Sequence, residues 1–331
     1  MFPVIALIII FLATSLYLAF QKIWRLETYP VTIAVSKTPL STPFYVAEKI
    51  NAFDETCVSV TFDDVIGGQK AFAKVMTGEA DFGTASDSVI AFRSLGQQQF
   101  VTHARFVQSD NDVKLISRVR DNIHSGKDLI NRTIGVTKGT ASEYFLSNLL
   151  ALNGLTTKNV IIKSYKPDQL MTAFINKEVD AITPWEPYAF QTKKQLKGQV
   201  KVHDTKNLNT LSFHLVSQTA DNLIVAKAAC ILQGLDKAID YISANPKKAQ
   251  QIVKDRLNLA QPFIDWIWPD YIFKIGLNRS FLLNIESQAV WAIDTQMTEY
   301  KKLPEFMTLI DTRALLQVAP MSVNIMASME H

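Results

Sequence analysis

The sequence predicts an α/β fold of two similar lobes that face each other across a cleft. Three observations support this fold class. The segment TIAVSK at residues 32–37 recurs as TIGVTK at residues 133–138. Three further segments recur in the same order, so that the four offsets fall between 99 and 102 residues. Strand-like runs alternate with helical patterns of about 10–15 residues, which is typical of βαβ units and a parallel sheet.

The composition is that of a folded chain of about two domains. At roughly 150 residues per domain, 331 residues correspond to two domains. A hydrophobic fraction of 48% excludes a disordered chain. A net charge of +3 without a basic run gives no reason to expect a nucleic-acid partner. Cys57 and Cys230 are the only cysteines, which excludes a disulfide framework and a cysteine-rich metal site but leaves open whether these two pair. We expect a monomer without a cofactor or a metal.

Residues 1–26 form a separate apolar start. The first 21 residues contain no charged side chain. About 20 apolar residues at 1.5 Å per residue match the roughly 30 Å hydrocarbon core of a bilayer. We predict an apolar helix that anchors the chain through residues 2–21, or a signal peptide cut after Ser15. The anchor is favoured because the apolar run continues past Ser15. Lys22 and Arg25 follow the span, and by themselves they would place the body in the cytoplasm, against the location inferred below.

The elements of the two halves follow in the same order. The first half is predicted to contain strand 32–37, helix 43–51, strand 58–62, helix 71–76 and a strand that begins at Asp81. The second half is predicted to contain strand 133–138, helix 141–153, strand 160–162, helix 170–175 and a strand that begins at Asp180. In each half a helix ends in a polar turn, and a short strand begins at the aspartate.

The last third of the chain is predicted to be mainly helical. Strand 210–217 is followed by helices 223–244, 246–257 and 281–297. Such a tail can pack on the first lobe and make that lobe discontinuous. We therefore predict a first lobe of residues 30–113 and 213–331 and a continuous second lobe of residues 114–212. The tail carries five aromatic residues that we expect in the core rather than against a ligand: Phe263, Trp266, Trp268, Phe273 and Trp291.

Polar loops follow the predicted strands. Ligands of open α/β sheets bind beyond the carboxyl ends of the strands, so the space between the lobes is the predicted small-molecule site. Residues 36–43 and 137–142 place hydroxyl groups before a helix. These hydroxyls can cap the helix, and the free N–H groups there can hold a carboxylate, sulfonate or phosphate. Capping is favoured at 41–42, and both roles stay open at 138–142. The pair Gly67-Gly68 is a turn or a close approach to a ligand.

Asp87 and Glu186 occupy equivalent positions in the two halves, at an offset of 99 residues. Two such carboxylates can perform acid–base chemistry, or they can hold a ligand amine or amidine between them. Asp87 can also cap the helix that follows it, whereas for Glu186 we favour a ligand contact. Trp185 suits stacking on a planar or cationic ligand group.

Signals of catalysis are absent from the sequence. It contains no G-x-S-x-G, Walker, G-x-G-x-x-G or H-E-x-x-H pattern, and the five histidines lack metal-ligand spacing. We therefore do not expect an enzyme.

Four segments together resemble a known family: residues 41–47 (STPFYVA), 78–83 (GEADFG), 134–140 (IGVTKGT) and 179–187, which contains VDA and WEP. In this order they resemble the nitrate/sulfonate/taurine-type periplasmic solute-binding proteins, whose relatives also bind thiamine-pyrimidine precursors. The resemblance runs from about residue 31 to residue 257.

The resemblance implies a two-lobed type II periplasmic binding protein fold with hinge strands near residues 113–118 and 211–217. It also implies periplasmic or other extracytoplasmic capture of a small ligand for the permease of an ABC importer, with closure of the lobes as the signal. Carried over residue by residue, the implied ligand contacts are Ser36, Tyr45, Gly68, Ser86, Asp87, Thr140, Ala141, Trp185 and Glu186. Two acidic residues in the cleft argue against a bare anion. We therefore expect a ligand that carries an amine, is zwitterionic or contains a planar N-heterocycle, of the sulfonate/taurine or pyrimidine-precursor type.

Two other functions stay open. The first is a membrane-anchored ligand sensor that works with a separate signalling partner. The second is an enzyme like the pyrimidine-precursor synthases of the family, which use a cysteine-rich segment and metal-linked histidines. This chain lacks the cysteine-rich segment.

Overall fold

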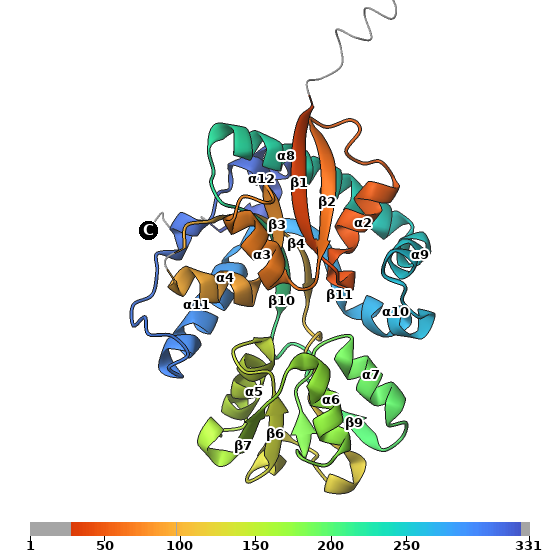
Figure 1. The fold of residues 1–331 in the computed structure, drawn as a ribbon, viewed down its shortest axis with the longest axis vertical. Coiled ribbons are helices and arrows are strands. Elements are labelled where there is room, and N and C mark those ends of the chain that lie inside the picture. Colours follow the sequence, from red (N-terminus) through yellow and green to blue (C-terminus); the bar gives the residue numbers. More distant parts are fainter. Residues whose placement is uncertain (1–27, 97, 326–331) are drawn as a thin grey trace, which may run out of the picture.

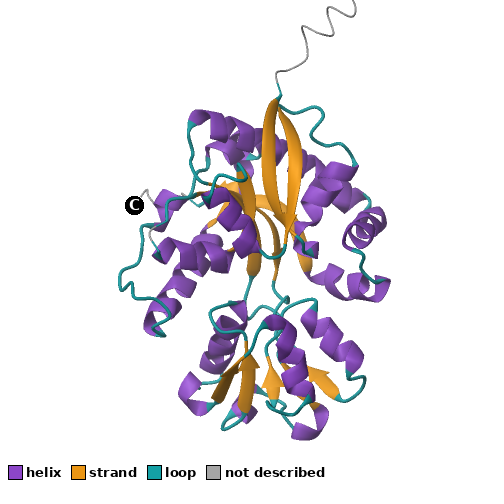
Figure 2. Cartoon of the chain, in the orientation of Figure 1, coloured by secondary structure: helices purple, strands orange, loops and turns teal. Residues whose placement is uncertain are grey.

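Two β-sheets, each flanked by helices, make up the structure, and the chain passes between them twice (Figure 1, Figure 2). The computed structural model describes residues 28–96 and 98–325. The seven-stranded sheet has the order β12-β11-β4-β10-β3-β1-β2, and the five-stranded sheet has the order β7-β6-β8-β5-β9. We call the part built on the seven-stranded sheet the first lobe and the part built on the five-stranded sheet the second lobe. The predicted α/β class with two sheets is confirmed.

The elements follow the chain in three stretches. The first lobe begins with β1 (Tyr29–Ser36), α2 (Thr42–Lys49), β2 (Val58–Val65), α3 (Gly68–Met76), β3 (Phe82–Ser86), α4 (Asp87–Leu95) and β4 (Val101–Ser109). The second lobe contains β5 (Ile116–Arg118), β6 (Thr133–Val136), α5 (Ala141–Leu152), β7 (Ile161–Ser164), α6 (Pro167–Ile175), β8 (Ala181–Ile182), α7 (Tyr188–Gln195) and β9 (Val200–Val202). The chain then completes the first lobe with β10 (Leu211–Ser217), α8 (Asn222–Ala244), α9 (Pro246–Leu257), α10 (Gln261–Ile267), β11 (Tyr271–Asn278), α11 (Arg279–Asp294), α12 (Arg313–Val318) and β12 (Val323–Asn324).

The same aspartate contact opens a central parallel strand in each sheet. Asp81, directly before β3, accepts a hydrogen bond at Oδ2 from the N–H of Thr32 at 2.8 Å. Asp180, directly before β8, accepts one at Oδ2 from the N–H of Thr133, also at 2.8 Å. The main-chain N–H of each aspartate donates in return to the carbonyl of the same threonine. Each aspartate therefore fixes a strand beside its parallel neighbour, which explains why the sequence repeats at these positions.

The C-terminal helices pack on the first lobe, where α8 lies against α2 and β11. In the core of this lobe the rings of Phe44 and Phe106 meet edge to face, with 4.9 Å between their centroids. Cys57, which directly precedes β2, forms a disulfide with Cys230 of α8, and their Cα atoms lie 5.6 Å apart. The cysteine pairing that the sequence left open is therefore present, and it joins the two chain segments of the first lobe.

The predicted helical tail is incomplete, because residues 271–278 form strand β11, antiparallel to β4. Three consecutive residues of this strand, 275–277, are buried, so the alternation that would reveal a strand in the sequence is lost. The five aromatic residues of the tail pack against the first-lobe core, with Phe263 buried and Trp266, Trp268, Phe273 and Trp291 partly buried.

The predicted signal peptide or anchor at residues 1–26, including the apolar helix, lies outside the described residues. Within residues 28–96 and 98–325, no helix combines the length and apolar character that a bilayer crossing requires.

Candidate functional site

The two lobes meet around a small cavity at the chain crossings. The first turns of α4 and α5, the crossing segments and α11 line it, through Ser88, Asp112, Val113, Ala141, Tyr144, Asn209, Thr210, Leu211 and Gln288. Its volume is about 10 Å³, which is room for one water molecule. Both α4 and α5 follow the carboxyl end of a parallel strand, so the carboxyl ends of β3 and β6 face the space between the lobes. Of the predicted contacts, Ala141 lines this interlobe cavity directly.

A buried ionic cluster lies at the crossings, and we call Asp112, Lys114, Glu186, Trp266 and Asp270 the hinge cluster. The Nζ atom of Lys114 lies 3.7 Å from Glu186 Oε1 and 3.8 Å from Asp270 Oδ2. The indole Nε1 of Trp266 donates a hydrogen bond to Glu186 Oε1 at 2.6 Å. Glu186 belongs to the second lobe, whereas Trp266 and Asp270 belong to the first. The hinge cluster therefore holds the two lobes together.

Three carboxylates in the hinge cluster share one buried lysine. Burial, together with the charge of Glu186, raises the pKa of Asp112 to about 7. Burial also raises the pKa of Glu186, although Trp266 and Lys114 act in the opposite direction. Asp270 has a second cation, because Lys206 Nζ lies 2.8 Å from its Oδ1. The charge of Asp112, between the lobes, therefore changes near neutral pH.

Asp87 is fully buried within the first lobe. Its Oδ1 lies 2.6 Å from His214 Nε2. Its Oδ2 accepts hydrogen bonds from the N–H of Ser212 at 2.7 Å and from Asn284 Nδ2 at 2.9 Å. Both oxygens are therefore engaged by β10 and α11, and this geometry gives no support to a ligand clamp formed by Asp87 and Glu186.

The other predicted contacts of the first lobe lie where β1 and β3 end. The Ser36 carbonyl accepts hydrogen bonds from Ser41 Oγ at 2.7 Å and from the Tyr45 hydroxyl at 3.1 Å. Tyr45 is buried beneath the strand end, and burial raises the pKa of its hydroxyl. Ser86 caps α4 by accepting a hydrogen bond from the N–H three residues later. A Cβ on Gly68 would lie 3.4 Å from the main-chain nitrogen of Ser86, so these strand ends are close together.

The loop before α5 uses its polar groups internally. Thr140 Oγ1 accepts a hydrogen bond from the N–H of Ser142 at 3.2 Å and donates one to the carbonyl of Thr137 at 2.6 Å. Gly139 has a φ of +72°, and its N–H donates to Glu143 Oε2 at 2.8 Å. Helix capping thus accounts for Thr140, and a carboxylate of the chain itself occupies one N–H group that an anion would use.

Trp185 lies at the end of β8, beside the crossing that leads into the second lobe. Its main chain bridges to Val113, and its ring packs half-buried against the second-lobe core. The ring of Tyr188 meets it edge to face, with 6.2 Å between centroids. Trp185 is therefore partly exposed and lies next to Glu186 of the hinge cluster.

The sequence did not indicate Asp112 and Lys114. Both are buried, although they alternate with the apolar residues Val113 and Leu115 directly before β5. Charged residues in such an apolar run are the signal that could have found them, since a buried charge needs a partner. Trp266 was expected in the core, whereas its indole N–H crosses to the other lobe.

Comparison with known proteins identifies a family and several relatives that the chain resembles. The sequence model of the family described as "NMT1/THI5 like" matches residues 38–249. A curated Brucella abortus protein, whose name proposes a binding function, is 24% identical over 181 residues, which cover 53% of this chain and 54% of that protein. The chain thus spans about half the length of the curated relatives it matches.

Solved structures share the fold. The periplasmic aliphatic sulphonate-binding protein of Escherichia coli has a TM-score of 0.73 and 16% identity, covering 86% of this chain and 92% of that one. The alkanesulfonate-binding protein of Xanthomonas axonopodis, bound to MOPS, has a TM-score of 0.69 and 15% identity, covering 86% and 99%. The ligand-binding component of an ABC-type import system of Staphylococcus aureus has a TM-score of 0.68 and 9% identity, covering 88% and 99%.

Proposed function

The chain belongs to the NMT1/THI5-like family, and on this premise we propose that it is the extracytoplasmic ligand-binding component of an ABC importer. Membership confirms the resemblance to the nitrate/sulfonate/taurine-type binding proteins. The observation that carries the proposal is the arrangement of two α/β lobes, joined by two chain crossings, with strand ends directed at the space between them. Such lobes close on a small ligand by rotation at the crossings, and the closed form engages a permease.

The disulfide supports the extracytoplasmic location. Cys57 and Cys230 are paired, and stable disulfides persist in oxidising compartments such as the periplasm. We propose that the body of the protein works there, held at the membrane through residues 2–21.

We propose a ligand that bears an amine, is zwitterionic or contains a planar N-heterocycle. Glu143 supports this choice, because its carboxylate holds the N–H of Gly139 and adds negative charge where a bare oxyanion would bind. Trp185 supplies the stacking face for a planar or cationic group. Ser36 adds a polar contact, since within the described residues no protein group hydrogen-bonds its hydroxyl.

Thermal denaturation of the purified full-length chain tests the ligand class. The panel contains taurine, aminopyrimidines and simple amines on one side, and nitrate, sulfate and methanesulfonate on the other. A ligand at a hundredfold excess over its Kd stabilises the fold by about 2.7 kcal/mol. For a chain of this length that raises Tm by roughly 4 °C. Stabilisation by the oxyanions and by no amine or heterocycle would contradict the proposal.

A pair of variants locates the binding site. Trp185→Ala should abolish the Tm shift produced by the ligand, because it removes the stacking face. Tyr29→Ala is the matched control, since Tyr29 is an exposed aromatic residue at the start of β1, whereas Ser36 lies at its end. Retention of the full Tm shift in Trp185→Ala would place the ligand elsewhere. Co-purification with a permease, rather than with a kinase, distinguishes the importer from a sensor.

A further inference from the structure

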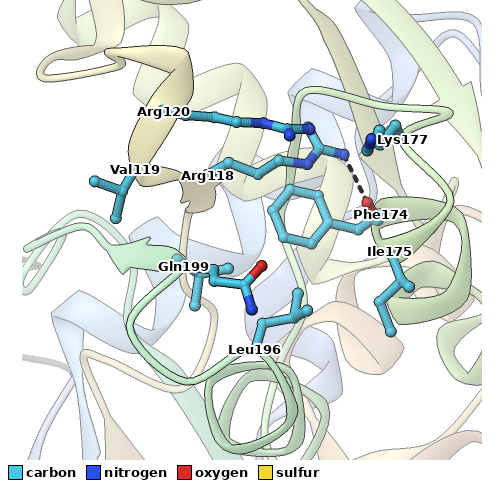
Figure 3. A pocket seen from close by; sticks show the side chains of 9 residues that line it. Arg118, Val119, Arg120, Phe174, Ile175, Lys177, Leu196 and Gln199 are labelled. Carbon is cyan, nitrogen blue, oxygen red and sulfur yellow. Dashed lines mark hydrogen bonds between the residues drawn. The ribbon is translucent and has the colours of Figure 1, made fainter.

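The second lobe contains a pocket, whose lining side chains are drawn in Figure 3. Strand β5 runs antiparallel to β8, so Arg118 at the end of β5 lies at the sheet edge opposite the crossings. The carboxyl end of α6 and the α7–β9 connection complete the pocket. Its volume is about 320 Å³, which is within the range of sites for small organic molecules.

One wall of the pocket is the guanidinium of Arg118, which makes three hydrogen bonds within the protein. Arg118 Nη2 donates hydrogen bonds to the carbonyls of Phe174 at 2.6 Å and Val179 at 2.8 Å. Its Nη1 donates to Asp121 Oδ2 at 2.9 Å. The guanidinium carbon lies 4.5 Å from the centroid of the Phe174 ring. Arg118 therefore binds the carbonyl groups at the C-terminal end of α6 and holds this wall in place.

Two further cations at the pocket are largely uncommitted. The Arg120 side chain is 60% exposed, and its Nε lies 3.7 Å from Asp121 Oδ1, beyond hydrogen-bond distance. Lys177 is exposed, at a positive φ of 65°, and forms no ion pair within residues 28–96 and 98–325. The lining residues include three cations, Arg118, Arg120 and Lys177, and no carboxylate, so the pocket wall carries an excess of positive charge.

Apart from these cations and the amide of Gln199, the lining is apolar. Phe174 is buried, and Ile175, Leu196 and Val200 are half-buried around it. In Figure 3 the Phe174 ring, Ile175 and Leu196 lie below the two arginines, with Lys177 beyond the end of Arg118. Cationic groups at the mouth and hydrocarbon within the pocket match a molecule that is anionic at one end and apolar at the other.

We propose that this pocket is a second binding site, separate from the interlobe site, for a small organic anion with an apolar body. Arg120 and Lys177 hold its carboxylate, sulfonate or phosphate group. The apolar body lies against Phe174, Leu196 and Val200. The inference goes beyond the proposed function, because it concerns a site that the importer cycle does not require.

Calorimetric titration of the full-length chain with 1-naphthalenesulfonate tests the proposal, and the uncharged 1-naphthalenesulfonamide is the matched probe. Arg120→Ala/Lys177→Ala should weaken sulfonate binding at least tenfold, a loss of about 1.4 kcal/mol. Lys127→Ala/Lys158→Ala removes two other exposed lysines of the same lobe and should leave the Kd within about twofold. Three results would overturn the proposal. The unaltered chain does not bind the sulfonate, the sulfonamide binds with the same affinity, or the control pair loses as much affinity as Arg120→Ala/Lys177→Ala.

Methyl NMR separates this site from the interlobe site. The probe should shift the methyl signals of Ile175, Leu196 and Val200, and it should do so equally in Trp185→Ala. Shifts confined to residues around Trp185 would overturn the second site while leaving the proposed function intact. If no ligand of the interlobe panel stabilises the chain, while these three methyl signals still shift with the probe, then the proposed function is wrong and the second site stands.

Discussion

Replacement of Asp112 by asparagine should change the pH dependence of stability. Asp112 faces Glu186, Lys114, Asp270 and the hydroxyl of Tyr271, and burial raises its pKa to about 7. In the unfolded chain this group returns to its ordinary pKa of 3.8. Between these two values the folded state binds more protons than the unfolded state, so the free energy of unfolding falls as pH rises. Asp112 therefore contributes its full stability below about pH 4 and loses it through pH 7.

The size of the effect follows from the two pKa values. One titrating group changes the free energy of unfolding by at most about 1.4 kcal/mol per pH unit, so three units set an upper limit of about 4 kcal/mol. Asparagine resembles the protonated aspartate in shape and charge. We therefore expect Asp112→Asn to match the unaltered protein near pH 4 and to exceed its stability near pH 8. A smaller slope remains in the variant, because burial also raises the pKa of Glu186.

Urea denaturation followed by tryptophan fluorescence, at intervals from pH 4 to pH 8, measures this slope. Glu299→Gln is the control, because Glu299 is exposed. Its stability curve should run parallel to that of the unaltered protein. If the Asp112→Asn curve is also parallel to it over the whole range, then Asp112 does not titrate between the lobes and the account of the hinge cluster is wrong.

Three further predictions concern stability and use the same urea assay. Trp266→Phe keeps a ring but removes the donor 2.6 Å from Glu186 Oε1, which should cost about 2 kcal/mol; an unchanged midpoint would show that water replaces the indole. Replacing Cys57 and Cys230 by serine should cost about 2–5 kcal/mol, and a thiol reductant should have no effect on that variant. Gly234→Ala places a Cβ against the ring of Phe53, so a cost of about 1–3 kcal/mol is expected, and a neutral result would mean that the ring moves freely.

The sequence predicts the βα succession well because the signals that specify it are local. Asp81 and Asp180 each accept a hydrogen bond at Oδ2 from a threonine of the neighbouring strand. The same contact is needed in both sheets, so the same residues recur in both halves of the sequence. Strand β11 escapes prediction because α8 covers it and its residues 275–277 are all buried. The apolar residue Ile272 is exposed, and together these positions leave β11 without a regular apolar–polar alternation.

The candidate site is less predictable because its partners are distant in the chain. Asp87 and Glu186 do stand at equivalent strand ends, as the offset of 99 residues indicates. The groups that form hydrogen bonds with them come from far along the chain, with His214 at 127 residues from Asp87 and Trp266 at 80 residues from Glu186. No local pattern shows that a carboxylate will meet a protein donor rather than a ligand. The same holds for Lys114, because Glu186 and Asp270, the carboxylates near its Nζ, are distant from it in the sequence.

The pairing of Ser109 with Leu211, where β4 leaves the first lobe and β10 returns to it, has a consequence for the order of folding. Closing a loop of about 100 residues costs roughly 4 kcal/mol of chain entropy. If the loop were unfolded, the hydrogen bonds between β4 and β10 would have to offset this cost. The second lobe lies wholly within that loop and has its own sheet and core clusters, so its folding would bring the two ends of the loop together. The topology therefore predicts that amides of β6 gain protection from hydrogen exchange before those of β10. In this order of folding, the second lobe forms first and holds together the two chain segments from which the first lobe then folds.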